Sequence, residues 1–361
     1  MLVFGTRPEA IKMCPLVLEL KRREAQFQVI VVVTGQHREM LKQVLDIFRV
    51  VPDYDLNIMK SGQNLYDITC NTLTGLKKII EKEAPDLLLV HGDTTTSFAS
   101  ALAGFYSRCK IGHVEAGLRT NNLSSPWPEE FNRVAVDIVS DYYFAPTQTA
   151  KENLLREGKT KPIWVTGNTG IDALKTTVRN DYQHPELVWS KGSRLVLITA
   201  HRRENLGRPM HAMFRAIRRV MEKHRDVKAI YPIHMNPQVR LAAHEELDGF
   251  ERIHIIEPLD VFDFHNFMKR SYLILTDSGG IQEEAPALGK PVLVVRDTTE
   301  RPEGVATGTL KLVGTEEEAI YREFDRLLSD TEEYRVMSQA KNPYGDGTAS
   351  YRIAEIISQF N

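Results

Sequence analysis

The chain has few cysteines, almost no net charge and no long hydrophobic run. Its three cysteines, Cys14, Cys70 and Cys109, are far apart in the sequence, which argues against a disulfide framework or a zinc site and predicts a reducing, cytoplasmic compartment. A formal net charge of −2 offers no global field for nucleic acid or a membrane surface. The most hydrophobic run, residues 29–33, is far too short to cross a membrane, and the amino terminus resembles a strand instead of a signal peptide. We therefore expect neither a nucleic-acid partner nor a membrane partner.

Short apolar runs alternate with helical stretches along all 361 residues. The expected strands are residues 2–4, 29–33, 87–90, 110–114, 142–145 and 163–165 in the first half and residues 195–198, 228–231, 254–256, 272–275, 292–295 and 310–313 in the second. Strands that alternate with helices predict parallel, doubly wound sheets. Since single cores stop growing at roughly 250 to 300 residues, we expect an α/β fold of two doubly wound, Rossmann-like domains that face a cleft.

The domain boundary is expected at a turn-rich segment. The motif TGNTG at residues 166–170 precedes a polar stretch, so residues 1–166 are assigned to the first domain and residues 167–346 to the second. Near the end of the chain, apolar residues recur at helical spacing through Ile353 and Ile357. Such an amphipathic helix needs a surface to cover, and we expect the helix of residues 347–361 to pack back on the first domain.

Four polar motifs directly follow expected strands. They are GTRPE at residues 5–9, HGDTT at 91–95, HVEAGLR at 113–119 and TDSGG at 276–280. The carboxyl ends of parallel strands form the edge where open α/β sheets bind ligands. Two carboxylates, Asp93 and Glu115, and a Ser-Gly-Gly anion cradle at such edges indicate an enzyme that acts on a phosphorylated substrate. No G-x-G-x-x-G motif follows a strand, so a dinucleotide redox cofactor has no fingerprint here.

The residues of the first half each have a structural alternative. Arg7 and Lys12 near a helix start predict a cationic site for a phosphate or carboxylate, or else an ordinary surface arginine. Asp93 could be only a helix cap. Glu115 is a poor cap among small and apolar neighbours, where a carboxylate without a role is costly, although Arg119 could pair with it.

The proline-braced loop PWPEE at residues 126–130 presents two more carboxylates, Glu129 and Glu130. Because a helix amino terminus favours acidic residues, one of the two is expected to serve only the helix. In the second half, the motif HRREN at residues 201–205 crowds cationic groups at a strand-to-helix turn. A phosphate contact or a solvated cluster would each account for it.

The motif at residues 277–284 is the sharper signal for a nucleotide. Gly279 and Gly280 let backbone amides approach a diphosphate, and Ser278 adds a hydroxyl group. Glu284 lies about one turn along the helix, where it could accept hydrogen bonds from ribose hydroxyls. A tight turn with a capping Asp277 is the alternative, but it leaves Glu284 unexplained.

Taken together, the motifs resemble the non-hydrolysing UDP-N-acetylglucosamine 2-epimerases. The matching segments are residues 5–12, 36–41, 91–95, 113–119, 126–130, 201–205, 277–286, 296–303 and 342–347. The resemblance covers essentially the whole chain in order. It implies a two-domain fold like that of the glycosyltransferase B enzymes, interconversion of UDP-N-acetylglucosamine and UDP-N-acetylmannosamine, no cofactor, and a homodimer. Family members carry a few more residues before the first strand, whereas Met1 abuts it here, so that strand should be short.

The resemblance also implies roles for individual residues. The acid/base carboxylates are Asp93, Glu115 and Glu129, and the groups around the sugar and diphosphate are Arg7, Lys12 and His201, the last of which we count with the catalytic residues. The UDP site comprises Ser278, Gly279, Gly280 and Glu284, with Phe264 at the uracil and Arg301 near the phosphates. Gln36 and His234 fall where some bacterial members bind a second, activating UDP-N-acetylglucosamine.

The chemistry of this reaction agrees with the residues. The proton on C2 has no adjacent carbonyl, so removing it directly is too unfavourable for a carboxylate. Elimination of UDP solves this, because C1 gains oxocarbenium character and the C2 proton becomes removable, giving 2-acetamidoglucal. Readdition with inversion needs acid/base groups on two faces of the sugar. The alternatives are a hydrolysing epimerase that releases N-acetylmannosamine, a sugar-nucleotide glycosyltransferase, and a non-catalytic sugar-nucleotide sensor.

Overall fold

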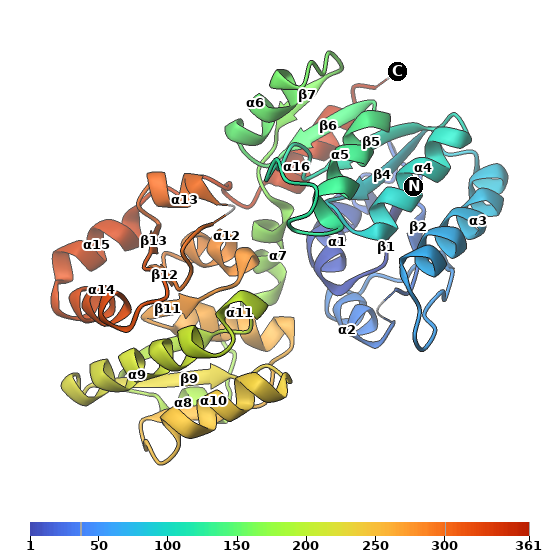
Figure 1. Cartoon of the computed structure of the whole chain (residues 1–361). Helices are drawn as coiled ribbons and strands as arrows, with labels where there is room; N and C mark the ends of the chain where they lie inside the picture. Colours follow the sequence, from blue (N-terminus) through green and yellow to red (C-terminus); the bar gives the residue numbers. More distant parts are fainter. Residues whose placement is uncertain (37, 300, 361) are drawn as a thin grey trace. The chain divides into compact units, whose positions relative to one another are not determined.

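The structure, a computed structural model, describes residues 1–36, 38–299 and 301–360. The chain forms two compact units, each of which is built around its own sheet (Figure 1). The first unit contains Met1–Thr176 and the segment that begins at Tyr344, and the second contains Thr177–Pro343. His37 and Glu300, which belong to two of the matching motifs, lie outside the described residues.

The chain leaves the first unit later than residue 166, where the turn-rich motif placed the boundary. Helix α7 (Thr169–Thr177) follows that motif and contains Asp172. The Asp172 carboxylate accepts the backbone N–H groups of Ala349 at 3.2 Å and Ser350 at 2.8 Å. These bonds attach α7 to the carboxyl-terminal segment, so α7 belongs to the first unit.

The first unit contains a parallel sheet of seven strands in the order β3-β2-β1-β4-β5-β6-β7. The strands are β1 (Leu2–Phe4), β2 (Val31–Val33), β3 (Tyr54–Asp55), β4 (Leu87–His91), β5 (Lys110–Val114), β6 (Tyr142–Ala145) and β7 (Ile163–Val165). The helices besides α7 are α1 (Arg7–Lys21), α2 (Arg38–Phe48), α3 (Leu65–Glu83), α4 (Thr95–Tyr106), α5 (Glu129–Val139), α6 (Gln148–Arg156) and α16 (Ala349–Ile357). Helices α3, α4 and α5 pack side by side, and α1 packs against α2 and α16.

The second unit repeats this arrangement with six parallel strands in the order β10-β9-β8-β11-β12-β13. The strands are β8 (Arg194–Thr199), β9 (Val227–Pro232), β10 (Ile253–Ile256), β11 (Leu273–Thr276), β12 (Val292–Val294) and β13 (Leu310–Leu312). The helices are α8 (Pro185–Trp189), η1 (Arg203–Asn205), α9 (Arg208–Lys223), α10 (Pro237–Leu247), α11 (Val261–Arg270), α12 (Gly279–Ala287), α13 (Pro302–Ala306), α14 (Glu317–Ser329) and α15 (Thr331–Gln339). The two doubly wound, Rossmann-like α/β sheets expected from the sequence are confirmed.

All twelve expected strands are present, and only their ends differ from the prediction. The short first strand is also observed, since β1 has three residues. Strand β3 was not predicted, because a two-residue strand, Tyr54–Asp55, has no apolar run to reveal it. Its position is set by pairing with β2, where Tyr54 lies opposite Val32.

Helices begin where polar side chains cap them. Thr6, Thr94 and Thr147 each precede a helix and accept a hydrogen bond from the backbone N–H three residues later. A cap of this kind contributes about 1 kcal/mol, because it satisfies an amide that has no partner inside the helix. In this way each of these strand-to-helix turns ends at a defined residue.

In both sheets the strand order reverses direction beside the first strand of the unit. The switch lies between β1 and β4 in the first unit and between β8 and β11 in the second. Doubly wound sheets bind ligands at the carboxyl ends of the strands at this switch point. The segments that follow these four strands contain Arg7, Asp93, His201 and Ser278, so these residues lie at the two switch points, while Glu115 follows the neighbouring strand β5.

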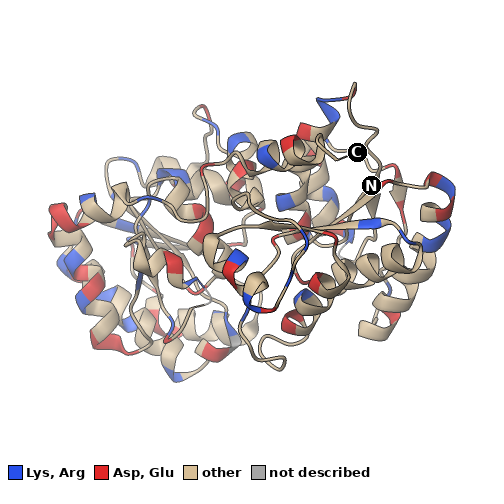
Figure 2. Cartoon of the chain, turned by 90° about the horizontal axis from the view of Figure 1, so that it is seen from above, with Lys and Arg blue, Asp and Glu red and all other residues tan. Residues whose placement is uncertain are grey.

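The carboxyl-terminal helix α16 covers part of the first unit. Ile353 and Ala354 are fully buried, and the ring of Phe360 stacks on Tyr142 of β6 at a centroid distance of 4.1 Å. Acidic and basic residues alternate over the helices of the molecule, in keeping with the small net charge (Figure 2). No helix among the described residues is long and apolar enough to cross a membrane.

Candidate active-site residues

Glu115 follows β5 and has a backbone conformation that is rare for a residue with a side chain. Its φ is +68°, in the left-handed region, and its N–H donates to the carbonyl of Phe144 at 3.0 Å. Such a conformation costs of order 1 kcal/mol or more and persists only where the surroundings impose it. Strain at a carboxylate on a ligand-binding sheet edge indicates a functional residue.

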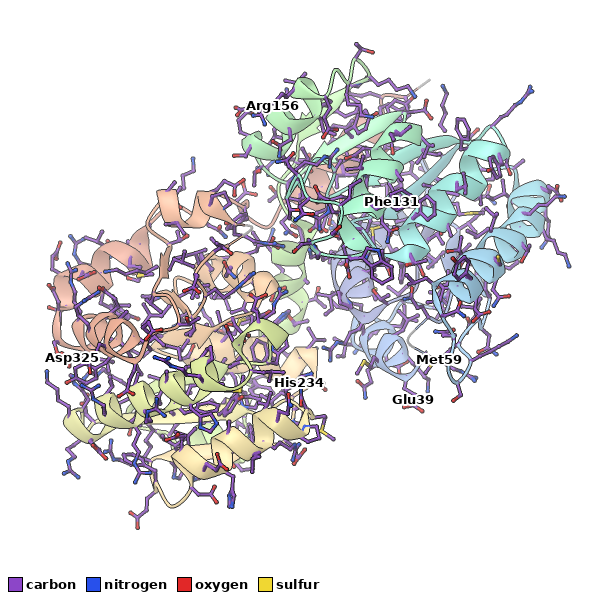
Figure 3. The ribbon with its side chains drawn as sticks, in the orientation of Figure 1. Glu39, Met59, Phe131, Arg156, His234 and Asp325 are labelled. Carbon is purple, nitrogen blue, oxygen red and sulfur yellow. The ribbon has the colours of Figure 1, made fainter. Side chains whose placement is uncertain are left out.

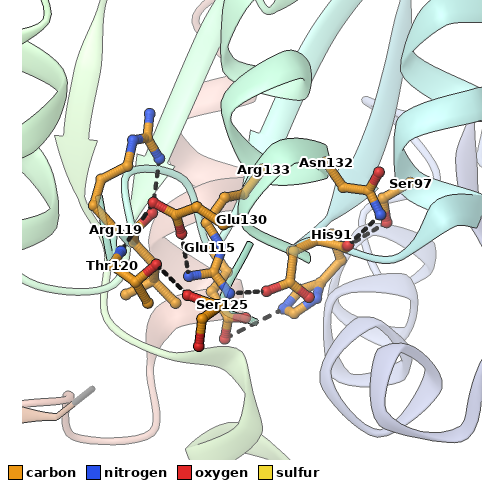
Figure 4. Close-up of polar contacts among 12 residues, drawn as sticks. His91, Ser97, Glu115, Arg119, Thr120, Ser125, Glu130, Asn132 and Arg133 are labelled. Carbon is orange, nitrogen blue, oxygen red and sulfur yellow. Dashed lines mark hydrogen bonds and ion pairs between the residues drawn. The ribbon is translucent and has the colours of Figure 1, made fainter. Parts of the chain in front are cut away.

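Three nitrogen groups surround Oε2 of Glu115, and His91, one of the three residues, is labelled beside Glu115 in Figure 4. The ammonium of Lys12 forms an ion pair with this oxygen, and the amide of Asn168 donates to it at 3.4 Å. Nε2 of His91 lies 3.7 Å from it. Lys12 and Glu115 were predicted separately, as a phosphate-site cation and an acid/base group, and the fold makes them direct partners.

His91 is buried, and its Nε2 has no hydrogen-bond partner within the described part of the chain. Burial, followed by the positive charge of Lys12, holds the pKa of His91 well below its usual value, so the ring is neutral. A buried ring nitrogen without a partner beside a strained glutamate is a polar group that ordinary packing leaves unexplained. No role for this histidine was predicted from the sequence.

Asp93 lies after β4 and is partly exposed. Arg133 of α5 forms an ion pair with its carboxylate, and the side-chain amide of Asn132 donates to its backbone carbonyl at 2.9 Å (Figure 4). The cap of α4 is Thr94, so capping does not account for Asp93. Its carboxylate is instead held in place by a cation and remains accessible.

The loop of residues 120–130 separates the roles of its two glutamates. Glu130 is buried and accepts the backbone N–H groups of Thr120 at 2.9 Å and Asn121 at 2.8 Å, while Arg133 donates to it at 3.0 Å. It therefore shapes the loop. Glu129 begins α5 and is half-buried. This leaves Glu129 as the glutamate of the pair that is available for chemistry.

The start of α1 is organised by Glu9. Its buried carboxylate accepts the backbone N–H groups of Gly5 at 3.0 Å and Thr6 at 2.8 Å, and the hydroxyl of Thr94 at 2.7 Å. Burial raises the pKa of Glu9 despite these hydrogen bonds. Since Glu9 takes these two amides, a ligand anion near this turn would meet the half-buried side chain of Arg7.

A network of buried charged and polar side chains connects His113, Asp137 and Arg119. His113 of β5 contacts Asp137 of α5, with Nδ1 2.6 Å from Oδ1, and Asp137 accepts a hydrogen bond from Arg119 at 2.7 Å. Arg119 also donates to Glu157 at 2.6 Å. The sequence suggested that Arg119 could pair with Glu115. That pairing is wrong, because the turn after Glu115 directs Arg119 to Asp137 and Glu157.

In the second unit, Asp277 connects the ends of β8 and β11. The fully buried carboxylate accepts the backbone N–H groups of His201 and Arg202, each at 2.9 Å, and the side-chain amide of Asn205 at 3.2 Å. Asp277 is thus not the cap of α12, which is Ser278. The cationic turn at residues 201–205 contains η1 instead of a full helix, and the buried anion at its amides is Asp277.

Two arginines approach the amino terminus of α12. A β-carbon added at Gly279 would lie 3.4 Å from Cζ of Arg301 and 3.6 Å from Nη2 of Arg202, whereas one added at Gly280 would meet open space. Guanidinium groups beside the amides and the positive dipole end of a helix form a binding site for anions such as phosphates. Arg301 is held in place by Glu283, which accepts from its Nε at 2.8 Å.

Glu284 lies within the second unit beside a buried histidine. Its Oε2 is 3.3 Å from Nε2 of His265, whose Nδ1 is 2.7 Å from the hydroxyl of Thr177. Phe264 precedes His265 in α11 and is half-buried. His265, which was not named from the sequence, thus connects α11, the helix that contains Phe264, with Glu284 of α12.

The two residues predicted at an activator site lie in different units. The Oε1 atom of Gln36 accepts the hydroxyl of the buried Thr96 at 2.8 Å. His234, labelled in Figure 3, is exposed. Its ring stacks on that of His201 with a centroid distance of 5.2 Å. Within the described residues, no group of three or more His, Cys, Asp or Glu side chains could hold a metal ion.

Sequence reasoning assigned no role to six residues that contact the candidate groups or their neighbours: His91, His113, Arg133, Asp137, Asn168 and His265. Four of them carry no signal in their spacing, because they meet their partners only in the fold. His91 and His113 were each visible as the first residue of a polar motif at a strand end. A histidine on an otherwise apolar strand could have been singled out for the cost of burying it.

Comparison with known proteins gives close matches over nearly the whole chain. The family model of the UDP-N-acetylglucosamine 2-epimerases matches residues 19–358. The UDP-N-acetylglucosamine 2-epimerase of Bacillus subtilis (strain 168) is 60% identical over 356 residues, which cover 98% of this chain and 93% of that protein. The UDP-N-acetylglucosamine 2-epimerase of Escherichia coli (strain K12) is 51% identical, with 98% and 97% covered.

A solved structure gives the same result for the fold. The crystal structure of the UDP-GlcNAc 2-epimerase from Neisseria meningitidis bound to UDP-GlcNAc has a TM-score of 0.90 and is 47% identical in sequence. The alignment covers 99% of each chain. Both units and their order along the chain are therefore shared with that protein.

Proposed function

Because this chain belongs to the UDP-N-acetylglucosamine 2-epimerase family, we propose that it interconverts UDP-N-acetylglucosamine and UDP-N-acetylmannosamine by elimination and readdition of UDP. The family establishes the enzyme class. The strained Glu115, held by Lys12 on the same sheet edge as Asp93, is the observation that carries the assignment of proton transfer to the first unit.

In this mechanism the C1–O bond to UDP breaks and its electron pair goes to the departing phosphate oxygen. A carboxylate of the first unit takes the C2 proton, and the electrons of the C2–H bond form the C1–C2 double bond of 2-acetamidoglucal. Returning a proton to C2 on the opposite face and UDP to C1 gives the epimer. Asp93, Glu115 and Glu129 are the three carboxylates proposed for these transfers.

The second unit supplies the groups proposed to hold UDP. Arg202, Arg301 and the amides at Gly279 and Gly280 are proposed to stabilise the charge that develops on the diphosphate as it leaves. Phe264 and Glu284 are proposed to contact the uracil and the ribose. His201 and Arg7 are proposed to contact the sugar or the diphosphate. No added redox cofactor is needed, since the elimination involves no net oxidation.

One incubation separates the alternatives. With UDP-N-acetylglucosamine as sole substrate in D2O, we expect UDP-N-acetylmannosamine with deuterium at C2, detected by proton NMR and mass spectrometry. A hydrolysing epimerase would give free N-acetylmannosamine and UDP, while a glycosyltransferase or a sensor would give no epimer. Transfer of hydrogen from C2 without solvent exchange would contradict proton removal by an accessible carboxylate.

We further propose an activator role for Gln36 and His234, the residues matched to a second UDP-N-acetylglucosamine site. Support comes from Gln36, whose bond to Thr96 ties its loop to the start of α4, next to Asp93. Starting from UDP-N-acetylmannosamine alone, turnover should lag until a trace of UDP-N-acetylglucosamine is added. Gln36→Ala should abolish this dependence, and full-rate conversion without a lag would leave Gln36 a structural residue.

The homodimer and the cytoplasmic location stay predictions. The first follows from the family resemblance and the second from three scattered cysteines. Light scattering of the purified chain at several concentrations tests the dimer, for which we expect a mass of twice 41.1 kDa.

A further inference from the structure

The fully buried His113 has hydrogen-bond acceptors on both of its ring nitrogens. Nε2 lies 2.8 Å from the backbone carbonyl oxygen of Gly92, and Nδ1 lies 2.6 Å from Oδ1 of Asp137. A carbonyl oxygen can only accept, so Nε2 must carry a proton. An ionised carboxylate also only accepts, so Nδ1 must carry the other. The geometry therefore describes a buried imidazolium.

Asp137 is the ionised partner that this requires. Arg119 donates to its second oxygen at 2.7 Å, and both side chains are almost completely buried. Burial alone would raise the pKa of Asp137, but the positive charges of His113 and Arg119 outweigh it and lower the pKa. The carboxylate is therefore charged, with one cation on each oxygen.

The Nε2 end of His113 fixes the backbone at Gly92, a residue whose conformation is flexible without such a contact. Gly92 has a φ of +65°, and a β-carbon there would lie 3.3 Å from Oε1 of Glu115. Glycine allows this conformation but does not enforce it. The Gly92 N–H donates to the carbonyl of Val114 at 2.9 Å, and His113 holds the carbonyl. Gly92 is thus held through both of the peptide groups that flank it, and His113 holds the one that leads into Asp93.

We propose that His113 is a positioning residue for epimerisation, which holds the Gly92 peptide, and with it Asp93 and Glu115, in the arrangement needed for proton transfer. This inference rests on the proposed function, because it assigns the work to those two carboxylates. A charge-assisted hydrogen bond is about twice as strong as a neutral one. A buried ion pair is in itself weak evidence of stabilisation, so a geometric role explains the arrangement better than a stability role.

Two substitutions separate the two ends of the imidazole. In His113→Gln, the side-chain amide reaches the position of Nε2 and can still donate to Gly92, but the contact with Asp137 is lost. In His113→Asn, the amide lies near the position of Nδ1 and can still donate to Asp137, but the Gly92 carbonyl loses its donor. Both variants replace the imidazole of His113, which pairs with Asp137, with a neutral amide, so both are expected to lower the unfolding temperature.

The two variants are expected to differ in kcat. His113→Asn should lower kcat about 100-fold, a loss typical of small misplacements of catalytic groups, while His113→Gln stays within about tenfold of the wild type. KM for UDP-N-acetylglucosamine and the affinity for UDP should change less than about threefold in both. His224→Gln is the matched control: its Nε2 lies 2.8 Å from Asp325 (labelled in Figure 3), far from these motifs in sequence, and full activity is expected.

Equal losses of kcat in the two variants, or a His113→Asn enzyme with normal kcat, would overturn the proposal. Wild-type enzyme that makes no epimer would instead overturn the proposed function, so the two failures are distinguishable. If His113→Asn does not fold, His113→Leu replaces it, because a side chain of similar size without a donor leaves the Gly92 carbonyl unpaired. A folded His113→Leu enzyme with unchanged kcat would also reject the positioning role.

Discussion

The carboxylate of Asp277 accepts a hydrogen bond from the backbone N–H of His201 at 2.9 Å and thereby joins the ends of two neighbouring strands. The same oxygen accepts the N–H of Arg202, and the side chain is fully buried. A residue that first looked like a helix cap therefore organises the turn that carries His201. The position of the proposed diphosphate-binding groups depends on this one carboxylate.

Asp277→Ala should weaken both the fold and UDP binding. Removing the carboxylate leaves two backbone amides and the amide of Asn205 without their acceptor. Hydrogen bonds to a charged group contribute about 1.5 to 3 kcal/mol, so we expect a loss of about 3 kcal/mol in the free energy of unfolding. Urea denaturation measures this loss, and isothermal titration with UDP should show weaker binding. Unchanged stability would show that the turn holds its shape without Asp277.

Glu129→Gln and Glu130→Gln should differ, although the two residues are neighbours. Glu129→Gln is expected to lower kcat at least about 100-fold, as for loss of a general acid or base, with little effect on stability. The same fall is expected for Asp93→Asn and Glu115→Gln. Glu130→Gln should mainly lower the unfolding temperature, because the amide oxygen can still accept from Thr120 and Asn121 but an NH2 group replaces the oxygen that accepts from Arg133 at 3.0 Å. Steady-state kinetics with thermal unfolding tests the pair, and near-normal kcat in Glu129→Gln would remove it from the mechanism.

Glu115→Gly should be more stable than Glu115→Ala. Both variants lose the carboxylate and its contact with Lys12, so their difference isolates the backbone at φ +68°. Glycine adopts this conformation without the steric cost that alanine meets, which is of order 1 kcal/mol. The midpoints of urea unfolding should differ accordingly. If Glu115→Ala proves equally stable, the backbone at this position is not strained.

The stability contributed by Asp137 should disappear in acid. Its pKa is lowered in the folded protein from the usual value of 3.8, since His113 and Arg119 outweigh the effect of burial. A depressed carboxyl pKa contributes stability above the unfolded value and loses it as the pH falls through the folded value. The difference in unfolding free energy between the wild type and Asp137→Asn should thus shrink as the pH falls below 3.8. A difference that does not change with pH would mean that Asp137 is neutral in the fold.

Much of the fold and several candidate site residues could be predicted from local sequence patterns. Apolar runs separated by helical stretches predicted two doubly wound sheets, because a buried parallel strand is apolar on both faces and a covering helix is not. The polar motifs at strand ends led directly to Asp93, Glu115 and Ser278, since strand ends in such sheets meet at one edge. Those inferences need only the order of residues along the chain.

Partnerships between distant residues were decided by the tertiary structure alone. Lys12 meets Glu115, and His113 meets Gly92 and Asp137, because the strand order brings β1, β4 and β5 side by side. Spacing along the chain does not encode such contacts, as the wrong pairing expected for Arg119 shows. The sequence by itself determined which chemical groups stand at the strand ends, and the packing of strands and helices determined which of them are held, charged or left exposed.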